Sequence, residues 1–124
     1  MKHETKFNKV KQFRQAFNKG EHNFCDKVKV YHQLDLITEE NKEVEDSILT
    51  KNPREEEILK ELCDLIYVCC DFAAAFGWDL DTAFNRVHNS NMSKLGSSGK
   101  PTYRKDGKVL KGPNYKQPWL GDLV

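Results

Sequence analysis

The sequence predicts an all-α protein: a four-helix bundle that is completed by oligomerisation and followed by a C-terminal hairpin and an extended arm. Apolar residues recur at helical spacing in four segments, and residues that cap or break helices separate these segments. Four helices in about 90 residues fit a helical bundle. The length of 124 residues suits one domain. We expect that domain to span residues 1–124, with a helical core at about 5–92 and a basic arm at about 93–124.

The first two helices are expected before a break at Asn52-Pro53. The apolar residues of the first follow one another at spacings of three, three and four, and they are Phe7, Val10, Phe13 and Phe17. Gly20 lies just past this helix, where a C-terminal cap is expected. The second helix is expected over about residues 24–49.

The third and fourth helices are expected after Pro53. This proline and the glutamates at 55–57 form a good helix start, because acidic side chains are stabilised at the positive end of the helix dipole. The third helix is expected over about residues 54–76, ending at Gly77. Asp79 is the expected N-cap of the fourth helix, whose apolar residues are Leu80, Ala83, Phe84 and Val87.

The third helix is apolar on nearly all sides. Its apolar residues include Leu62, Leu65, Ile66, Val68, Cys69, Phe72, Ala73, Ala74 and Ala75. A helix of this kind needs cover on most of its surface, and one helical hairpin cannot supply that cover. We therefore expect a homodimer or a homotetramer.

The C-terminal arm differs in character from the helical part. A flexible connection is expected at residues 96–101, and Asp106-Gly107 is the preferred central pair of a tight hairpin turn. Residues 112–124 are expected to be extended. The stretch 94–116 holds seven positive side chains against the single Asp106, a net charge of +6. Such a stretch could form the phosphate-facing wall of a site.

Composition excludes several classes. No run of eighteen apolar residues exists, so a membrane span is not expected, and the N-terminus lacks the apolar stretch of a signal peptide. We expect a cytoplasmic protein, in the host cytoplasm if it is encoded by a phage. The formal net charge of +1 does not mark a nucleic-acid binder. The four cysteines are expected to be free and buried, and the lack of a C-x2-C pair argues against zinc.

Acidic residues interrupt the apolar faces of the second and third helices. On a wheel of about 100° per residue, Glu40 falls inside the apolar arc of the second helix, with Glu43 at its edge and Glu39 beside Glu43. On the third helix, Glu61 falls inside the arc and Asp64 at its edge. Acids from two neighbouring helices would therefore point at one another.

A divalent cation would resolve the repulsion between these acids. Burying ionised carboxylates costs free energy unless an opposite charge accompanies them. Hard oxygen ligands suit magnesium or manganese, and no glutamate here has a histidine three residues later, as a di-iron bundle would require. Asp71 lies further along the edge that carries Asp64. Either acidic cluster, taken alone, could simply be a helix face exposed to solvent. Two such clusters on adjacent helices, both on the apolar arcs, favour a metal site over that alternative.

The acidic pattern resembles a known family motif. Glu39-Glu40-x-x-Glu43 is followed, after a gap of 17 residues, by Glu61-x-x-Asp64. This arrangement is similar to that of the MazG-like superfamily of all-helical nucleoside triphosphate pyrophosphohydrolases. The superfamily also includes dimeric dUTPases and phosphoribosyl-ATP pyrophosphohydrolases.

The resemblance extends over about residues 5–95. Asn91-x-x-Lys94 is similar to a phosphate-contacting pair of the family, and residues 99–115 look like a tail found in one MazG-like subset of phage and bacterial proteins. The resemblance implies hydrolysis between the α and β phosphates of a nucleoside triphosphate, which releases a monophosphate and pyrophosphate.

The resemblance also implies roles for individual residues. Magnesium, or manganese in its place, would be bound by Glu40, Glu43, Glu61 and Asp64. Glu39, together with Glu43, would act in catalysis, with Glu39 orienting or deprotonating the attacking water. The expected phosphate contacts are Asn91, Lys94, Lys108 and Lys111. Tyr115 is the aromatic residue that is expected to close the site.

Recognition of the base is expected near the first helix and the start of the second. The candidates are His32, Phe13, Phe17 and Trp78, each of which is also explained as an ordinary core or surface residue. The tail favours deoxynucleotides, with the purine nucleotides dGTP and dATP slightly preferred.

Other functions remain open at this level. Phosphoribosyl-ATP pyrophosphohydrolase activity shares the fold and the acidic motif with the favoured function. A nucleic-acid-binding module would use the basic arm, but it would not need carboxylates on core-facing arcs, so no nucleic-acid partner is expected. A catalytically inactive helical oligomer would not need all five acids.

Overall fold

The computed structural model describes residues 4–96 and 98–124 and confirms the all-α prediction. Four helices dominate these residues: α1 (Lys6–Ala16), α2 (Lys27–Ile48), α3 (Glu55–Ala75) and α4 (Leu80–Met92). They are followed by the short strands β1 (Thr102–Tyr103) and β2 (Val109–Leu110) and by a 3-10 turn, η1 (Gly121–Leu123). The chain forms two compact units that divide after Leu80, and each is described by itself. Ser97, in the predicted flexible connection, lies outside the described residues.

Helix α1 begins at a side-chain cap and ends earlier than the position of Gly20 suggested. The Thr5 hydroxyl accepts a hydrogen bond from the Asn8 amide at 3.0 Å, which satisfies one of the donors left free at a helix start. At the other end, Asn18 adopts φ 54°, a left-handed conformation that asparagine tolerates. Gly20, with φ 69°, lies two residues further along the chain.

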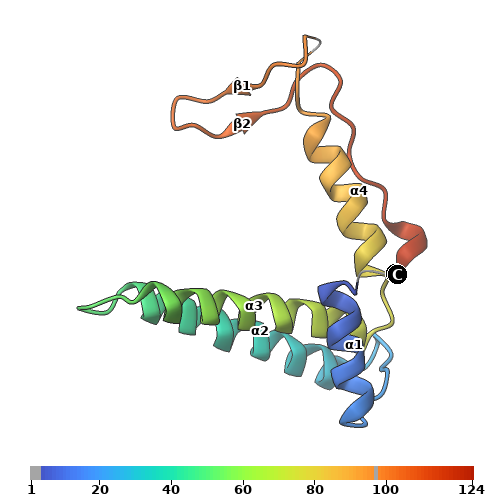
Figure 1. Cartoon of the computed structure of the whole chain (residues 1–124). Coiled ribbons are helices and arrows are strands. Elements are labelled where there is room, and N and C mark those ends of the chain that lie inside the picture. Colours follow the sequence, from blue (N-terminus) through green and yellow to red (C-terminus); the bar gives the residue numbers. More distant parts are fainter. Residues whose placement is uncertain (1–3, 97) are drawn as a thin grey trace. The chain divides into compact units, whose positions relative to one another are not determined.

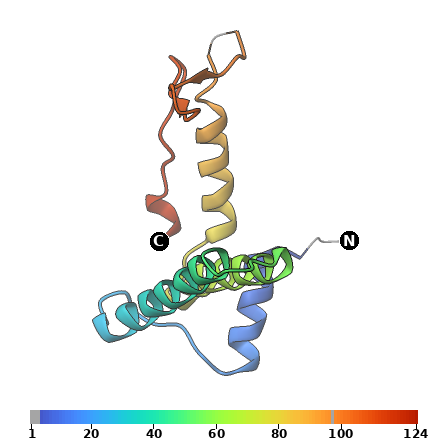
Figure 2. The ribbon, with the colours of Figure 1, turned by 90° about the vertical axis from the view of Figure 1, so that its left-hand side faces the viewer.

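Helices α2 and α3 form a long antiparallel hairpin in the N-terminal unit (Figure 1). Helix α2 starts three residues later than expected because Asp26 serves as its N-cap and accepts from the Lys29 amide at 3.4 Å. Three glutamates fill the first turn of α3, as predicted, where they face the positive end of its dipole. Viewed from the loop that joins them, the two helices lie beside each other (Figure 2).

Helix α1 crosses the C-terminal end of α3, and the core of the N-terminal unit lies at this crossing (Figure 1). The buried apolar residues there are Phe7, Val10, Cys70 and Ala73. An aromatic group covers the adjoining end of α3 with ring centroids 5.3–5.9 Å apart, and it consists of Phe24, Phe72, Phe76 and Trp78. Gly77, with φ 71°, ends α3 as predicted.

The hairpin remote from this crossing is poorly covered in the single chain. Leu34, Ile48 and Leu62, which the wheels assign to core-facing arcs, are 49%, 48% and 41% exposed. Leu59 and Ile66 are also exposed. The four cysteines are free as expected, but only Cys70 is buried, because the surface around the other three is open in one chain.

The C-terminal unit consists of α4, the β1–β2 hairpin and the segment that follows. The strands pair antiparallel, with Tyr103 opposite Val109. The turn differs from the predicted one: the Gly107 amide donates to the Arg104 carbonyl at 2.9 Å, so the central pair is Lys105-Asp106. Gly107, at φ 90°, takes the bulge position of a three-residue loop, where a left-handed conformation is required.

The segment after β2 is extended, as predicted, and returns along α4 (Figure 1). The Ser90 hydroxyl donates to the Lys116 carbonyl at 2.6 Å, and the Lys116 amide donates to the Ser93 hydroxyl at 2.9 Å. Near the C-terminus, Arg86 forms an ion pair with Asp122 at 2.5 Å. Within the described ranges, no helix has the length and hydrophobicity that a membrane span requires.

Candidate metal centre and active site

Three carboxylates meet between α2 and α3. Glu40 comes from α2, and Glu61 and Asp64 come from α3; one oxygen of each lies within 4.8 Å of the others. The Glu61 side chain is 18% exposed and that of Asp64 is 37% exposed, which agrees with the wheel positions inside and at the edge of the apolar arc. We call these three residues the acidic layer.

The antiparallel packing of the two helices brings these carboxylates together. The buried side chains of Gln33 and Asp71 are joined by a hydrogen bond of 2.8 Å at one point of the hairpin. Seven residues, or two turns, further along α2 comes Glu40, and seven residues back along α3 comes Asp64. Equal steps in opposite directions keep residues facing across an antiparallel pair. The same register places Glu43 opposite Glu61.

The acidic layer carries more negative than positive charge. The pKa of Glu40 is raised above its ordinary value, first by burial and then by the charges of Asp64 and Glu61, with a smaller contribution from Glu43. Lys60 lowers the pKa of Glu40, but its contribution is smaller than that of either neighbouring acid on α3. The fold therefore holds like charges together against their repulsion.

The donor set of the acidic layer fits a hard divalent cation. Three carboxylate oxygens converge from two helices, and the layer contains no thiol or imidazole. Oxygen ligands of this kind suit magnesium or manganese. Such a cation would also supply the positive charge that the layer lacks.

The two remaining acids of the sequence motif lie outside this trio. Glu43 is exposed on α2, one turn after Glu40, and acts on the Glu40 carboxyl through its charge. Glu39 is also exposed and does not belong to the trio.

A second polar layer, which we name the Arg14 layer, consists of Arg14, Gln33 and Asp71. Arg14 donates to Asp71 at 2.7 Å and to the Gly20 carbonyl at 2.6 Å, while Gln33 donates to the other Asp71 oxygen at 2.8 Å. All three residues are buried. This network ties α1, α2 and α3 together, and the sequence reasoning missed it. The available signal was the position of Arg14 on the buried stripe of α1, four residues after Val10.

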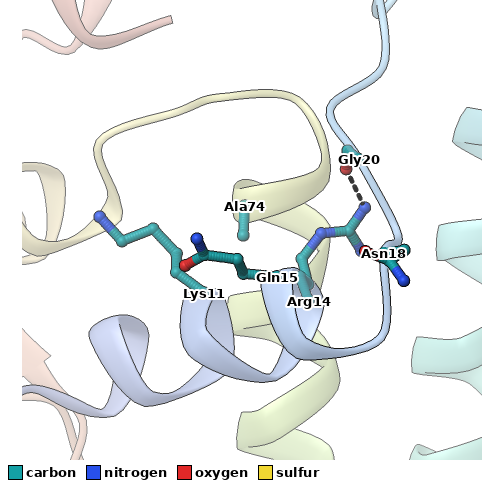
Figure 3. Close-up of a pocket in the computed structure, with 6 residues that line it drawn as sticks. All are labelled: Lys11, Arg14, Gln15, Asn18, Gly20 and Ala74. Atoms are coloured by element: carbon teal, nitrogen blue, oxygen red, sulfur yellow. Dashed lines mark hydrogen bonds between the residues drawn. The ribbon is translucent and has the colours of Figure 1, made fainter.

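A pocket of about 490 Å³ lies beside Arg14 (Figure 3). Arg14 and Gly20 lie at one side of it, Ala74 of α3 lies behind, and Lys11, Gln15 and Asn18 complete the lining. None of the residues predicted for the site lines this pocket.

The residues proposed for the base occupy different environments. Phe17 is 64% exposed and packs against Phe13 with ring centroids 4.5 Å apart. Phe13 also meets Tyr67 edge-on at 5.6 Å, and Tyr67 lies one turn after Asp64 on α3. Trp78 instead belongs to the aromatic group that packs on the core, and His32 is exposed on α2.

The residues proposed for phosphate binding lie in the C-terminal unit. The Gly112 amide donates to the Lys94 carbonyl at 2.8 Å, which brings the chain on both sides of Gly112 close to the end of α4. Lys111 lies over the Tyr115 ring at 4.7 Å from its centroid. Lys108 lies at the hairpin turn, and Asn91 is exposed near the end of α4.

A family profile described as phosphoribosyl-ATP pyrophosphohydrolase matches residues 10–91, about two thirds of the chain. The chain belongs to this family. It is therefore also a member of the MazG-like all-α superfamily of nucleoside triphosphate pyrophosphohydrolases, as the acidic motif predicted. A search of curated proteins found no match to the chain.

Membership of the phosphoribosyl-ATP pyrophosphohydrolase family identifies the chain as a pyrophosphohydrolase that acts on nucleotides. The family depends on divalent metal, and the structure contains an acidic cluster, the acidic layer. Every residue of the acidic layer lies within the matched range. The arm from residue 92 onward lies outside it.

Proposed function

We propose that this pyrophosphohydrolase hydrolyses nucleoside triphosphates to the monophosphate and pyrophosphate in a magnesium-dependent reaction. Deoxynucleotides are the preferred substrates, with dGTP and dATP slightly favoured. The single observation that carries the proposal is the convergence of Glu40, Glu61 and Asp64 within the family's matched range. Magnesium suits this layer because all of its donors are carboxylate oxygens.

Each acid has a proposed role. Glu40, Glu61 and Asp64 hold the magnesium ion, with Glu43 as a further ligand from the next turn of α2. A bound magnesium ion supplies charge neutralisation for the phosphates and acidifies water. Glu39 and Glu43 lie on the exposed side of α2, where a carboxylate can orient the attacking water or accept its proton. Water adds to the α phosphorus, and pyrophosphate leaves with the electrons of the broken bond.

Contacts to the substrate are proposed for the residues that the sequence singled out. Phosphate oxygens are bound by Asn91, Lys94, Lys108 and Lys111, and Tyr115 closes over them. Phe17 and His32 contact the base, and both side chains are exposed, as this role requires. Trp78 was a further candidate for the base, but its packing against Phe72 and Phe76 supports a structural contribution.

Phosphoribosyl-ATP is the second candidate substrate, and the matched family carries its name. Hydrolysis would occur at the same bond of its triphosphate group and would use the same acidic layer. The basic arm favours the nucleoside triphosphates, because its net charge of +6 over residues 94–116 suits phosphate binding and lies outside the matched residues 10–91.

We also propose that the chain acts as one functional domain in a homodimer or homotetramer. The exposed apolar residues along the α2–α3 hairpin support this assembly, since a helix that is apolar nearly all round is stable only when covered. We further propose that the enzyme works in the cytoplasm, on free nucleotides.

The test is a product analysis. The protein is incubated with each NTP, each dNTP and phosphoribosyl-ATP in the presence of magnesium, and the products are separated. The proposal predicts a monophosphate plus pyrophosphate, with the highest turnover for deoxynucleotides. Diphosphate plus orthophosphate, or no turnover with any of them, would overturn the activity. Turnover of phosphoribosyl-ATP alone would replace the proposed substrate with the second candidate.

Two isosteric variants test the residue assignment. Glu43→Gln and Asp64→Asn each remove one charge from the proposed metal ligands, so turnover should be abolished while the circular dichroism of the helices is unchanged. Asp46→Asn on the exposed side of α2 is the matched control and should keep full activity. Retained activity in both test variants would show that the metal assignment is wrong.

A further inference from the structure

Lys60 makes direct contact with the acidic layer. Its ammonium lies 2.7 Å from one Asp64 oxygen and 3.7 Å from one Glu61 oxygen. The Lys60 side chain is 68% exposed, so it approaches the carboxylates from the solvent side. Neither the acidic motif nor the list of expected phosphate contacts includes this residue.

The position of Lys60 makes it a competitor for a metal ion. Any divalent cation held by the acidic layer needs oxygens of Asp64 and Glu61, the two residues with which Lys60 is paired. The Arg14 layer shows the opposite arrangement, since the side chains of Arg14 and Asp71 are only 7% and 9% exposed. A lysine on a long, exposed stem can leave its carboxylate at little cost.

We propose that Lys60 is a displaceable counter-ion of the metal site, which gives up Asp64 to a divalent cation and then binds a phosphate oxygen of the substrate. This proposal rests on the assignment of the acidic layer as the metal site. A triphosphate brings about four negative charges, more than one magnesium ion neutralises. Lys60 is a strongly hydrated point charge at the rim of the layer, and lysines commonly bind phosphate in this manner.

The metal-binding half of the proposal is tested without any reaction. Manganese binding is followed by electron paramagnetic resonance in the wild-type protein and in Lys60→Ala and Lys60→Arg variants. Removing the competitor should tighten binding about two- to five-fold in Lys60→Ala, the range expected for a pair this exposed, whereas Lys60→Arg should stay close to wild type. Unchanged or weaker binding in Lys60→Ala would overturn the proposal.

The chain offers a matched control. Lys42 forms an exposed pair with Asp46 at 3.4 Å and with the same spacing of four residues, but Asp46 does not belong to the acidic layer. Lys42→Ala removes the same charge from the neighbouring helix and should leave manganese binding unchanged. If manganese binding tightened equally in Lys42→Ala, the effect of Lys60→Ala would come from the change in net charge alone. That result would overturn the specific role of Lys60.

The substrate-binding half is tested at saturating magnesium. Lys60→Ala should raise the KM for the triphosphate several-fold. In Lys60→Arg the positive charge is kept, so the KM should stay close to that of the wild type. An unchanged KM in Lys60→Ala would overturn the phosphate contact. Glu61→Gln separates this result from a failure of the metal assignment: if Glu61→Gln binds manganese as well as the wild type does, the proposed metal site itself is wrong.

Discussion

Two polar layers lie along the α2–α3 hairpin, two helical turns apart, and they differ in their balance of charge. In the Arg14 layer, one carboxylate is matched by a guanidinium and an amide, and all three side chains are buried. In the acidic layer, three carboxylates meet, and among the residues that the structure describes only the exposed Lys60 forms ion pairs with them. The charge of the first layer is balanced within the chain, whereas the second carries an excess of negative charge, which we propose a divalent cation neutralises.

We propose that this difference in charge balance distinguishes polar groups that stabilise the fold from polar groups that bind a ligand. A buried ion pair with all its hydrogen bonds satisfied holds elements in place, and losing one partner is costly because the other is left uncompensated. A cluster of like charges opposes folding, so the fold keeps it at the expense of stability. Charge balance, rather than burial alone, is therefore the reason for which we propose the acidic layer as the ligand-binding one.

The largest expected effect comes from breaking the Arg14 layer. Asp71→Ala leaves the Arg14 guanidinium buried without its carboxylate, and the free energy of unfolding should fall by about 3–5 kcal/mol. Urea denaturation followed by circular dichroism measures this loss.

The control for this variant removes both charges. The double variant Arg14→Leu, Asp71→Leu replaces the pair with apolar side chains, and it should be more stable than Asp71→Ala. A loss below about 1 kcal/mol in Asp71→Ala would show that the Arg14 layer is not structural.

The same kind of substitution in the acidic layer should have the opposite effect on stability. Glu40→Gln removes one of three repelling charges, so the metal-free protein should be more stable than the wild type at neutral pH. Activity should fall by on the order of a hundred-fold or more, because a proposed metal ligand is lost. Urea denaturation in EDTA and a pyrophosphate-release assay measure the two effects. A destabilised Glu40→Gln protein would contradict the distinction between the layers.

A smaller effect is expected from pH. The pKa of Glu40 in the fold lies above its ordinary value of 4.5, so the folded state binds more protons than the unfolded state between these two values. Stability in EDTA should therefore fall as the pH rises through this window and level off above it. Glu40→Gln should lack this contribution. If the free energies of unfolding of the wild type and Glu40→Gln differed by a constant amount from pH 4.5 to 7, the pKa of Glu40 would not be raised by the fold.

The sequence predicted the four helices because their signals are local. The spacing of apolar residues, the glutamates after Pro53 and the glycine at 77 each act within a few residues. The hairpin turn was assigned to the wrong pair because Asp106-Gly107 also occurs in three-residue loops, where only the glycine is left-handed.

The acidic layer was predictable and the Arg14 layer was not, for a physical reason. Repeated acids on the apolar arcs of two adjacent helices are visible on helical wheels, and they match a motif. Arg14 lies in α1, 57 residues from its partner Asp71, and only the crossing of α1 over α3 brings the two together. Such a crossing depends on tertiary packing, which periodicity does not reveal.

The central claim, that the acidic layer binds a divalent cation and the Arg14 layer does not, is tested most directly by isothermal titration of magnesium into the metal-free protein. The wild type should bind, Glu61→Gln should lose most of the affinity, and Gln33→Ala, in the Arg14 layer, should bind as the wild type does. Failure of the wild type to bind magnesium, or equal binding by Glu61→Gln, would contradict the account.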